Sequence, residues 1–373
     1  MMQKLKRREF IKKGAAATLV GGTAISACST PQSGDAPTVR TRKNYEWQMV
    51  TTWPPGFPVM GEGAEMMAKW IEDASDGQMK INVFGGGELV PAFESFEAVS
   101  QGVAHMSHGV SYYWAGKSEA TPFFGAVPFG MNTQQMNAWI YCGGGLELWE
   151  ELYAPFNILP MPAGNTGMQM GGWFNKQINS IEDIKGLKMR IPGLGGKVID
   201  KAGGTGLSTP GSEIYTNLDR GVIDATEWVG PYHDYKLGLH KIADYYYYPG
   251  WHEPCAVLEL GVNRPAFEAL PSHLQQIIRS AAARANIWML SEFEAKNNEY
   301  LQKLVNENNV DLRRFPDDVL AAFQKHSQEI IDDVVNRVPM AKKIYASYST
   351  FRKAVTSWAA VTEQDYYTRL SKI

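Results

Sequence analysis

Short runs of alternating apolar and polar residues appear early in the chain, and each is followed by apolar residues at helical spacing. Residues 45–50 and 80–84 alternate as half-buried strands do, whereas residues 63–75 and 93–102 have helical periodicity. Residues 104–109 have the composition of a short buried strand. This alternation of strands and helices predicts an α/β unit with a mainly parallel sheet.

A second unit with the same alternation is expected from about residue 162 to residue 251. Residues 168–174, 223–228 and 244–248 have strand character, and residues 212–220 are expected to form a helix. A chain of 373 residues is long enough for two domains.

The last third of the chain is rich in helix-forming residues. Amphipathic spacing predicts helices over residues 271–289, 292–307 and 317–337, and a long final helix over residues 341–372. A terminal helix of that length packs either on its own lobe or on a second chain.

The first residues have the pattern of an export signal. Two arginines lie within residues 6–12, and residues 14–25 form an apolar run that is too short and too rich in glycine to span a bilayer. The sequence before Cys28 resembles a lipobox, so we expect residues 1–27 to be a twin-arginine signal peptide and Cys28 to be lipidated. The alternative is a plain signal peptide followed by a chance cysteine. Residues 28–44 read as a polar linker between the anchor and the fold.

Charge limits the possible partners. Without residues 1–27 the chain has 30 basic and 38 acidic residues, a net charge of −8. This balance argues against nucleic acid as a partner and against adsorption to anionic lipid. It also means that a site for an anion must supply its own positive charge. Cys142 and Cys255 either pair in an oxidising compartment or remain free thiols.

Common catalytic motifs are absent. The sequence has no phosphate-binding loop, no zinc-binding His-Glu-x-x-His and no Gly-x-Ser-x-Gly nucleophile elbow. Two pairs of histidines, His105 with His108 and His233 with His240, lack an obvious third ligand, so we interpret them as core or surface residues. Residues 51–58 contain three prolines and are expected to form a stiff loop.

Four polar residues lie within aromatic segments that are rich in glycine and proline: Arg190, Gln169, Glu227 and Glu253. Burying such groups without partners costs several kcal/mol, so they are expected to converge on one another or on a ligand. The guanidinium of Arg190 matches a carboxylate, and the hard oxygens of the other three favour Na⁺ or Ca²⁺. One hypothesis is a ligand carboxylate held by Arg190 and bridged by that cation. The other is a buried salt-bridge network without a ligand.

Three longer motifs, at residues 189–193, 218–228 and 247–254, resemble those of the DctP-type solute receptors of tripartite ATP-independent periplasmic (TRAP) transporters. The chain is most similar to the branch that binds 2-oxo acids and lactate. The resemblance implies an α/β, two-lobed, periplasmic-binding-protein-like fold with a ligand cleft between the lobes and a long C-terminal helix.

The resemblance also implies a division of the chain into lobes. Residues 45–161 with parts of 255–373 correspond to lobe I, and residues 162–254 with other parts of 255–373 correspond to lobe II. Residues 341–373 correspond to the long terminal helix, through which members of this branch can form homodimers.

Site residues follow from the same resemblance. Arg190 matches the family's carboxylate-binding arginine. Gln169, Glu227, the carbonyl of Trp228 and Glu253 match the ligands of a bridging Na⁺ or Ca²⁺. Gln169, Trp228 and Glu253 are also expected to contact the substrate, together with a pocket tyrosine that matches Tyr112 or its neighbour Tyr113.

The implied function is that of an extracytoplasmic receptor. It would bind a small monocarboxylate such as pyruvate or lactate in the periplasm and deliver it to the TRAP membrane subunits, tethered to the inner membrane through Cys28. Two alternatives remain: a metal-assisted exported enzyme that uses Glu227 or Glu253 as a base, and a sensory input protein with the same cleft.

Overall fold

A computed structural model describes residues 43–370 of the chain. The predicted signal peptide at 1–27, Cys28 and all but the end of the predicted linker 28–44 lie outside the described residues, as do residues 371–373. Among the described helices, none is both long enough and apolar enough to cross a membrane.

The first sheet has five strands in the order β2-β1-β3-β10-β4. Its strands are β1 (Tyr45–Thr51), β2 (Met79–Phe84), β3 (Met106–Val110), β4 (Ile158–Asn165) and β10 (Val257–Asn263). β1 pairs in parallel with β2 and β3, whereas β10 pairs antiparallel with both β3 and β4. β10 is therefore the one reversed strand in an otherwise parallel sheet, as the sequence predicts for the first unit.

The helices of the first unit include the two predicted ones, α1 (Met60–Ala74) and α2 (Ser95–Ser100), and several that the periodicity did not predict. The other described helices before the second sheet are η1 (Ala92–Glu94), η2 (Ser111–Trp114), α3 (Pro122–Gly125), α4 (Thr133–Cys142), α5 (Gly145–Tyr153) and η3 (Ala154–Phe156). Every residue of β4 is buried although it contains two prolines, which hid this strand from the sequence pattern.

The second sheet has six strands in the order β11-β9-β5-β8-β6-β7. Its strands are β5 (Gly172–Phe174), β6 (Lys188–Arg190), β7 (Thr205–Leu207), β8 (Ala225–Thr226), β9 (Tyr245–Tyr248) and β11 (Asp311–Arg314). β5 pairs antiparallel with β8 and β9, and the remaining pairs are parallel. The helices of this unit are η4 (Ile181–Ile184), α6 (Gly193–Lys201), α7 (Gly211–Asp219), α8 (Pro231–Leu237) and η5 (Leu239–Lys241).

Two predicted strands are shorter in the structure. The expected strand 168–174 contracts to β5, and the expected strand 223–228 contracts to β8. The residues left out of these strands use their backbone groups in other contacts: Met170 N–H donates to the Val229 carbonyl, and Glu227 N–H donates to the Arg190 carbonyl. These residues therefore form loops at the sheet edge, where side chains can face a ligand.

The predicted helices of the last third are joined and broken differently. The expected helices 271–289 and 292–307 are one continuous helix, α10 (Ser272–Gln302), which runs into a π-helical turn, η6 (Lys303–Glu307). No glycine or proline lies within α10, so nothing interrupts it. α11 (Asp317–Arg337) has the predicted bounds. The expected single helix 341–372 is divided: α12 (Pro339–Val361) ends at Thr362, and α13 (Glu363–Asp365) and η7 (Tyr366–Leu370) follow.

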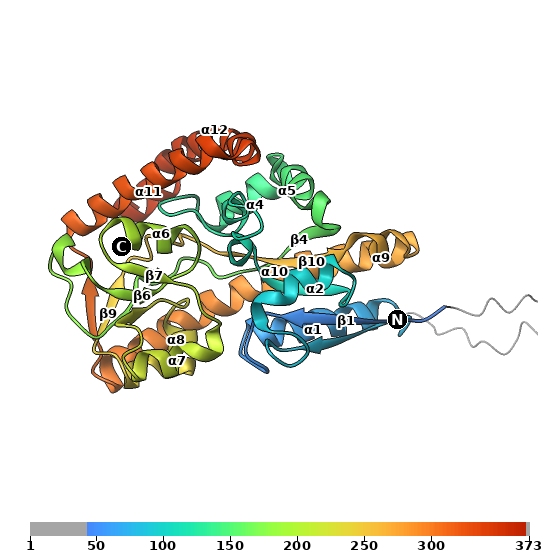
Figure 1. Ribbon diagram of the computed structural model, residues 1–373, viewed down its shortest axis with the longest axis horizontal. Helices are drawn as coiled ribbons and strands as arrows, with labels where there is room; N and C mark the ends of the chain where they lie inside the picture. The colour runs from blue at the N-terminus through green and yellow to red at the C-terminus, as the bar shows by residue number, and fades with distance from the viewer. Residues whose placement is uncertain (1–42, 371–373) are drawn as a thin grey trace, which may run out of the picture. The chain divides into compact units, whose positions relative to one another are not determined.

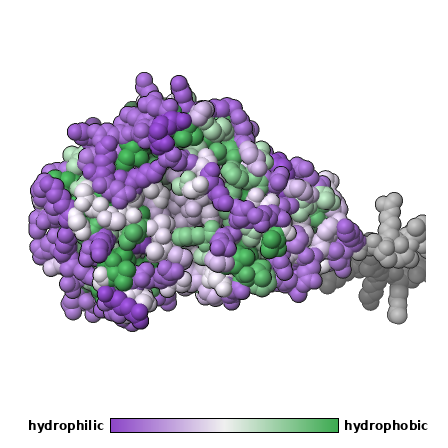
Figure 2. Space-filling model, in the orientation of Figure 1, coloured by the Kyte–Doolittle hydropathy of each residue, from purple (hydrophilic) through white to green (hydrophobic). Residues whose placement is uncertain are grey.

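Three long helices connect the two sheet units (Figure 1). α10 packs on α1 and β4 of the first unit and on α8 of the second. α11 packs on α6, and α12 packs on α3, α4 and α5. The remaining helix of the described residues, α9 (Arg264–Glu268), directly follows β10. On the face shown in Figure 2, hydrophilic side chains predominate and hydrophobic ones form separate patches.

Two further segments cross between the sheets, residues 166–171 after β4 and residues 249–256 before β10. They lie side by side: Gly250 N–H donates to the Gln169 carbonyl at 3.0 Å, and Thr166 N–H donates to the Ala256 carbonyl at 3.1 Å. A Cβ atom at Gly250 would lie 2.2 Å from the backbone carbonyl oxygen of Gln169, so only glycine permits the two segments to approach this closely. The predicted lobe boundary at residue 162 falls inside β4 of the first sheet. Both remaining cysteines are free: Cys142 is exposed and Cys255 is buried.

Candidate functional site

Arg190 and Glu227 form a buried ion pair in the second unit. Arg190 is the last residue of β6, and Glu227 directly follows β8, the parallel neighbour of β6. Arg190 Nη1 lies 2.5 Å from Glu227 Oε1, and each residue is only 1% exposed. The pairing follows from topology, because adjacent parallel strands end at the same edge of a sheet.

The rest of the guanidinium is held by backbone and by aromatic rings. Nε and Nη2 of Arg190 each donate to the Thr209 carbonyl at 3.2 Å, and its Cζ lies 5.4 Å from the centre of the Trp228 ring. Burial works to lower the pKa of Arg190, but Glu227 and the tyrosines Tyr113 and Tyr112 outweigh it and raise that pKa. The guanidinium is therefore a permanent positive charge.

Gln169 and Glu253 lie on the two crossing segments. Gln169 Nε2 donates to Glu253 Oε2 at 2.7 Å and to Thr166 Oγ1 at 3.1 Å. The side-chain amide oxygen of Gln169, Oε1, is buried without a hydrogen-bond partner. A buried carbonyl without a donor loses its hydration without compensation, so Oε1 is suited to a ligand that accepts electron density, such as a cation.

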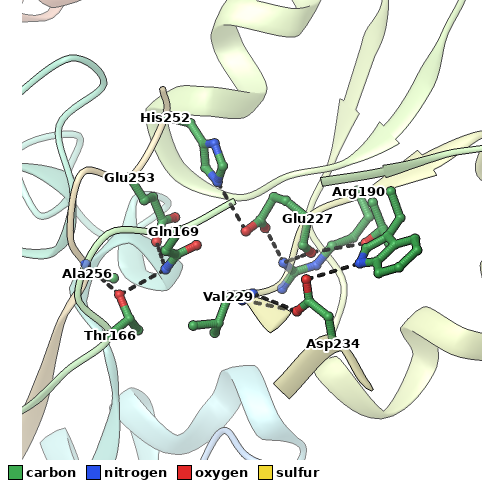
Figure 3. A network of polar contacts seen from close by, with 12 residues as sticks. Thr166, Gln169, Arg190, Glu227, Val229, Asp234, His252, Glu253 and Ala256 are labelled. Atoms are coloured by element: carbon green, nitrogen blue, oxygen red, sulfur yellow. Dashed lines mark hydrogen bonds and ion pairs between the residues drawn. The ribbon is translucent and has the colours of Figure 1, made fainter. Parts of the chain in front are cut away.

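The carboxylates of Glu227 and Glu253 lie close together, with His252 beside them (Figure 3). One ligand atom from each of the three residues lies within 4.8 Å of the other two, and His252 Nε2 is 3.3 Å from Glu227 Oε2. Burial, followed by repulsion from Glu227, raises the pKa of Glu253 well above its usual range. A cation bound between the carboxylates would reverse that repulsion. The donors present are hard oxygens with one imidazole, so the residues fit Na⁺ or Ca²⁺.

The first unit contributes two tyrosines from η2. Burial and, after it, the nearby Glu253 carboxyl raise the pKa of Tyr112, whereas burial raises the pKa of Tyr113 against the opposing effect of the nearby Arg190 guanidinium. Tyr112 also packs on the turn that opens α6: Gly193 has φ +64°, and a Cβ there would lie 3.1 Å from Tyr112 Cβ. The site thus takes residues from both sheet units and from the segments that join them.

Asp234 supports the loop that carries Glu227 and Trp228. Its Oδ1 accepts hydrogen bonds from the N–H groups of Val229 and Gly230, both at 3.2 Å. Its Oδ2 accepts from Trp173 Nε1 at 3.0 Å and from the Tyr246 hydroxyl at 2.7 Å. Burial raises the pKa of Asp234 to about 7. The carboxyl joins the loop after Trp228 to strands β5 and β9.

The structure places the predicted site residues in one cluster. Arg190 contacts Glu227 and Trp228, and Gln169 contacts Glu253. Tyr112 lies near enough to Glu253 for that carboxyl, after burial, to raise its pKa. The sequence interpretation did not assign His252 or Thr209 to the site. His252 lies within a quoted motif beside Glu253, so its position was a usable signal. Thr209 contributes only a backbone carbonyl, which no residue type reveals.

Two of the histidines interpreted as core residues are indeed fully buried. Burial lowers the pKa of His108 to about 4 and that of His233 to about 3. Each has both ring nitrogens in hydrogen bonds with a tryptophan and a backbone carbonyl. They are neutral structural groups at physiological pH.

The site is a closed cluster of buried charged and amide groups. Arg190, Glu227, Gln169 and Glu253 are each no more than 3% exposed. A solute reaches them only when the surrounding segments move apart. A guanidinium beside two carboxylates and an unpartnered amide oxygen can bind a carboxylate and a cation together.

Comparison with known proteins gives consistent matches. Residues 49–337 match the family described as bacterial extracellular solute-binding protein, family 7. The chain is 43% identical over 362 residues to the monocarboxylate 2-oxoacid-binding periplasmic protein of Nostoc sp. PCC 7120, covering 97% of this chain and 98% of that protein.

Two solved structures agree with the fold. A TRAP periplasmic solute-binding protein from Pseudoalteromonas atlantica T6c, with bound sodium and pyruvate, is 41% identical with a TM-score of 0.85, covering 88% of this chain and 100% of that chain. A TRAP solute-binding protein from Bordetella bronchiseptica RB50 is 39% identical with a TM-score of 0.85, covering 87% and 97%. It is a mixed-occupancy dimer with copurified calcium and picolinate in an active site, and with an apo site. These matches confirm the predicted fold class.

Proposed function

This chain belongs to the bacterial extracellular solute-binding protein family 7, and from that membership we propose that it is the receptor of a TRAP transporter for a small 2-oxo monocarboxylate such as pyruvate. The family binds solutes and does not transform them, so the prediction of a receptor rather than an enzyme is confirmed. Glu227 and Glu253 are accordingly assigned to binding and not to base catalysis.

The observation that carries the proposal is the buried Arg190–Glu227 pair next to Glu253. Arg190 provides the positive charge that an acidic protein must place beside an anionic solute. Glu227 occupies part of the guanidinium, so a solute carboxylate must share Arg190 or displace Glu227. With two carboxylates in the site, binding a third needs a cation to offset their repulsion.

We assign the cation to Gln169 Oε1, the carboxylates of Glu227 and Glu253, and the Trp228 carbonyl. The unpartnered Gln169 oxygen and the raised pKa of Glu253 support this assignment, because both are costs that a cation removes. When bound, the ion neutralises the site and bridges it to the solute. Tyr112 and Tyr113 close the site from the first unit.

The solute class follows from the chemistry of the relatives' ligands. Pyruvate has a carboxylate beside a ketone oxygen, and picolinate has a carboxylate beside a ring nitrogen. The donor spacing in each molecule allows it to close a five-membered chelate ring on one cation. We propose that this chain selects monocarboxylates with a donor atom on the adjacent carbon, and that lactate, with its 2-hydroxyl group, is a weaker member of the class.

Calorimetry tests the proposal. Chelator-treated protein is titrated with pyruvate, lactate, picolinate and propionate, with and without added Na⁺ or Ca²⁺. Pyruvate should bind only with the cation, and propionate, which lacks the adjacent donor, should bind at least about tenfold more weakly. Arg190→Ala should abolish binding, and Arg190→Lys should restore little of it, because an ammonium lacks the planar fork.

Binding of pyruvate that is indifferent to added cation would contradict the assigned metal site. Near-wild-type affinity in Arg190→Ala would contradict the role of the guanidinium. Circular dichroism of both variants establishes that they fold.

We further propose that the chain is exported by the twin-arginine route and tethered through Cys28, from which it delivers solute to the TRAP membrane subunits. The two arginines within residues 6–12 and the lipobox sequence support this proposal. Cys28→Ala should move the protein from the membrane fraction to the soluble periplasmic fraction. Unchanged fractionation would contradict the lipid anchor.

We also propose a homodimer formed through the C-terminal helices. α12 and the turns after it expose four large side chains to solvent: Trp358, Val361, Tyr366 and Tyr367. Exposed apolar groups gathered on neighbouring elements are typical of an interface.

A further inference from the structure

A pair of hydrogen bonds through His233 connects Trp228 to the first sheet unit. The Trp228 indole Nε1–H donates to His233 Nδ1 at 3.3 Å, and His233 Nε2 lies 2.8 Å from the Pro58 carbonyl oxygen. Trp228 and His233 belong to the second unit, in the loop after β8 and in α8, whereas Pro58 precedes α1 of the first unit. His233 has no exposed surface.

The two partners fix the protonation of the ring. An indole N–H can only donate and a carbonyl oxygen can only accept. Nδ1 of His233 must therefore be the acceptor, and Nε2 must carry the proton and donate to Pro58. The imidazole is neutral and in one tautomer, and any other form would leave one contact unmade.

The loop that presents Pro58 is held firmly at its other end. Trp53 Nε1 donates to His108 Nδ1 at 2.7 Å, and His108 Nε2 lies 3.2 Å from the Ala163 carbonyl of β4. As at His233, a tryptophan N–H donates to Nδ1 and a backbone carbonyl lies next to Nε2. Residues 53–58 are therefore anchored by His108 at one end and by His233 at the other. Three prolines within this short loop restrict its backbone further.

Backbone geometry aims the Pro58 carbonyl. Val59 is buried and has φ +58° and ψ −61°, a conformation that costs a β-branched residue of order 1–3 kcal/mol. This turn lets Met60 N–H donate to the Pro58 carbonyl at 2.6 Å while the same oxygen faces His233. Strain of this kind persists only where the surrounding contacts hold it in place.

Aromatic contacts fix the same pair of side chains. Phe57, the residue before Pro58, packs edge-on against His233 and Trp228. The centre of its ring lies 4.7 Å from that of His233 and 5.9 Å from that of Trp228. On its other side His233 packs against Phe293 of α10, with ring centres 4.6 Å apart. The imidazole is thus enclosed by both sheet units and by the helix that joins them.

We propose that His233 is a positioning residue of the solute site, through which the 53–58 loop of the first unit sets the position of Trp228. Trp228 covers the Arg190 guanidinium and provides the carbonyl assigned to the cation. The two sheet units must therefore be docked at this loop for Trp228 to take its binding position. This inference rests on the proposed function, because it concerns the assembly of that site.

Two substitutions separate the two halves of the link. His233→Asn keeps an acceptor where Nδ1 meets Trp228 and removes the bond to Pro58. His233→Gln keeps a donor near Nε2 that can reach Pro58 and removes the acceptor for Trp228. Each should weaken pyruvate affinity in the presence of cation about tenfold, mainly through faster dissociation, because each removes one buried hydrogen bond. His240→Gln, on η5 of the same unit, is the matched control and should bind like wild type.

Nitrogen-15 spectra of the ligand-free protein supply a readout that does not depend on binding. In wild type the His233 signals should show an unprotonated Nδ1 and a protonated Nε2. Trp228→Phe, which keeps a smaller aromatic ring near Arg190 and removes the N–H donor together with part of the indole, should shift the Nδ1 signal. In His233→Asn the Trp228 indole signal should remain that of a hydrogen-bonded group, and in His233→Gln it should not.

The outcomes separate this inference from the proposed function. If wild type binds pyruvate and both His233 variants bind it equally tightly, the positioning role is wrong and the receptor assignment stands. A protonated Nδ1 in wild type would overturn the link directly, even if a variant failed to fold. If wild type binds no 2-oxo acid while the spectra are as expected, the proposed solute is wrong and the contact itself stands.

Discussion

Gln169 Nε2 lies 2.7 Å from Glu253 Oε2, across the two segments that cross between the sheets, and this contact leaves Gln169 Oε1 buried without a donor. The side-chain amide thus anchors one carboxylate with its nitrogen and leaves its oxygen without a partner beside the same carboxylate. Because both segments join the two units, any hinge motion between the units acts directly on this pair.

Gln169→Leu tests the oxygen as a cation ligand. The substitution keeps the approximate size of the side chain and removes both amide atoms, so calcium affinity of the chelator-treated protein should fall at least about tenfold. Calorimetry with Ca²⁺ alone measures this. Gln328→Leu, on the exposed face of α11, is the matched control and should leave affinity unchanged. Equal calcium affinity in Gln169→Leu and wild type would remove Gln169 from the ligand set.

Glu227→Gln tests the electrostatics of the buried pair. Arg190 loses the charge of its partner while remaining 1% exposed, so the free energy of unfolding should fall by about 3 kcal/mol. Glu253 loses a repelling neighbour, so its raised pKa should move back towards the usual range. Urea denaturation measures the first effect, and carbon-13 titration of the glutamate carboxyls measures the second. Unchanged stability would mean that the pair contributes nothing to the fold.

His108 predicts a pH dependence of stability. Its pKa is about 4 in the folded protein and about 6.5 when unfolded, so between these values the unfolded chain binds the proton first. Above pH 6.5 the neutral ring makes its whole contribution to the free energy of unfolding. As the pH drops from 6.5 to 4, the folded protein loses roughly 3 kcal/mol of stability through this group.

His108→Asn retains an acceptor for Trp53 but cannot be protonated, so the stability difference between wild type and variant should narrow as the pH falls. Asp234, whose raised pKa acts with the opposite sign, is present in both proteins and cancels in the comparison. Denaturant midpoints at pH 7.0 and 4.5 provide the measurement, with His326→Gln on α11 as the control. A constant difference across this range would show that His108 does not titrate as described.

The C-terminal elements predict an oligomeric state. Trp358 and Val361 are 67% and 71% exposed, so their replacement by lysine should leave the monomer fold intact and prevent a dimer. Sedimentation equilibrium of wild type, Trp358→Lys/Val361→Lys and the control Gln328→Lys measures the mass. A monomeric wild type at micromolar concentration would contradict the homodimer.

Local periodicity determined much of the fold in advance. β1, β2, β9, α1 and α11 lie within a few residues of their predicted bounds, because alternation and helical spacing report directly which side chains face a core. The sequence pattern did not predict two strands that lack alternation. β4 and β10 are buried along their whole length, and β4 contains two prolines. The break of the final helix at Thr362 also had no local signal.

The sequence alone also predicted that Arg190, Gln169, Glu227 and Glu253 converge on one another or on a ligand. The reason is that charged or amide groups within aromatic and glycine-rich segments cannot be buried without partners. The sequence could not decide which groups pair. Arg190 meets Glu227 because β6 and β8 are neighbours in the sheet, and Gln169 meets Glu253 because two crossing segments run together over a separation of 84 residues. It left His233 as a core histidine, since its partner Pro58 lies 175 residues away. Residue type sets which contacts are needed, whereas chain topology, which depends on long-range packing, decides which partner supplies them.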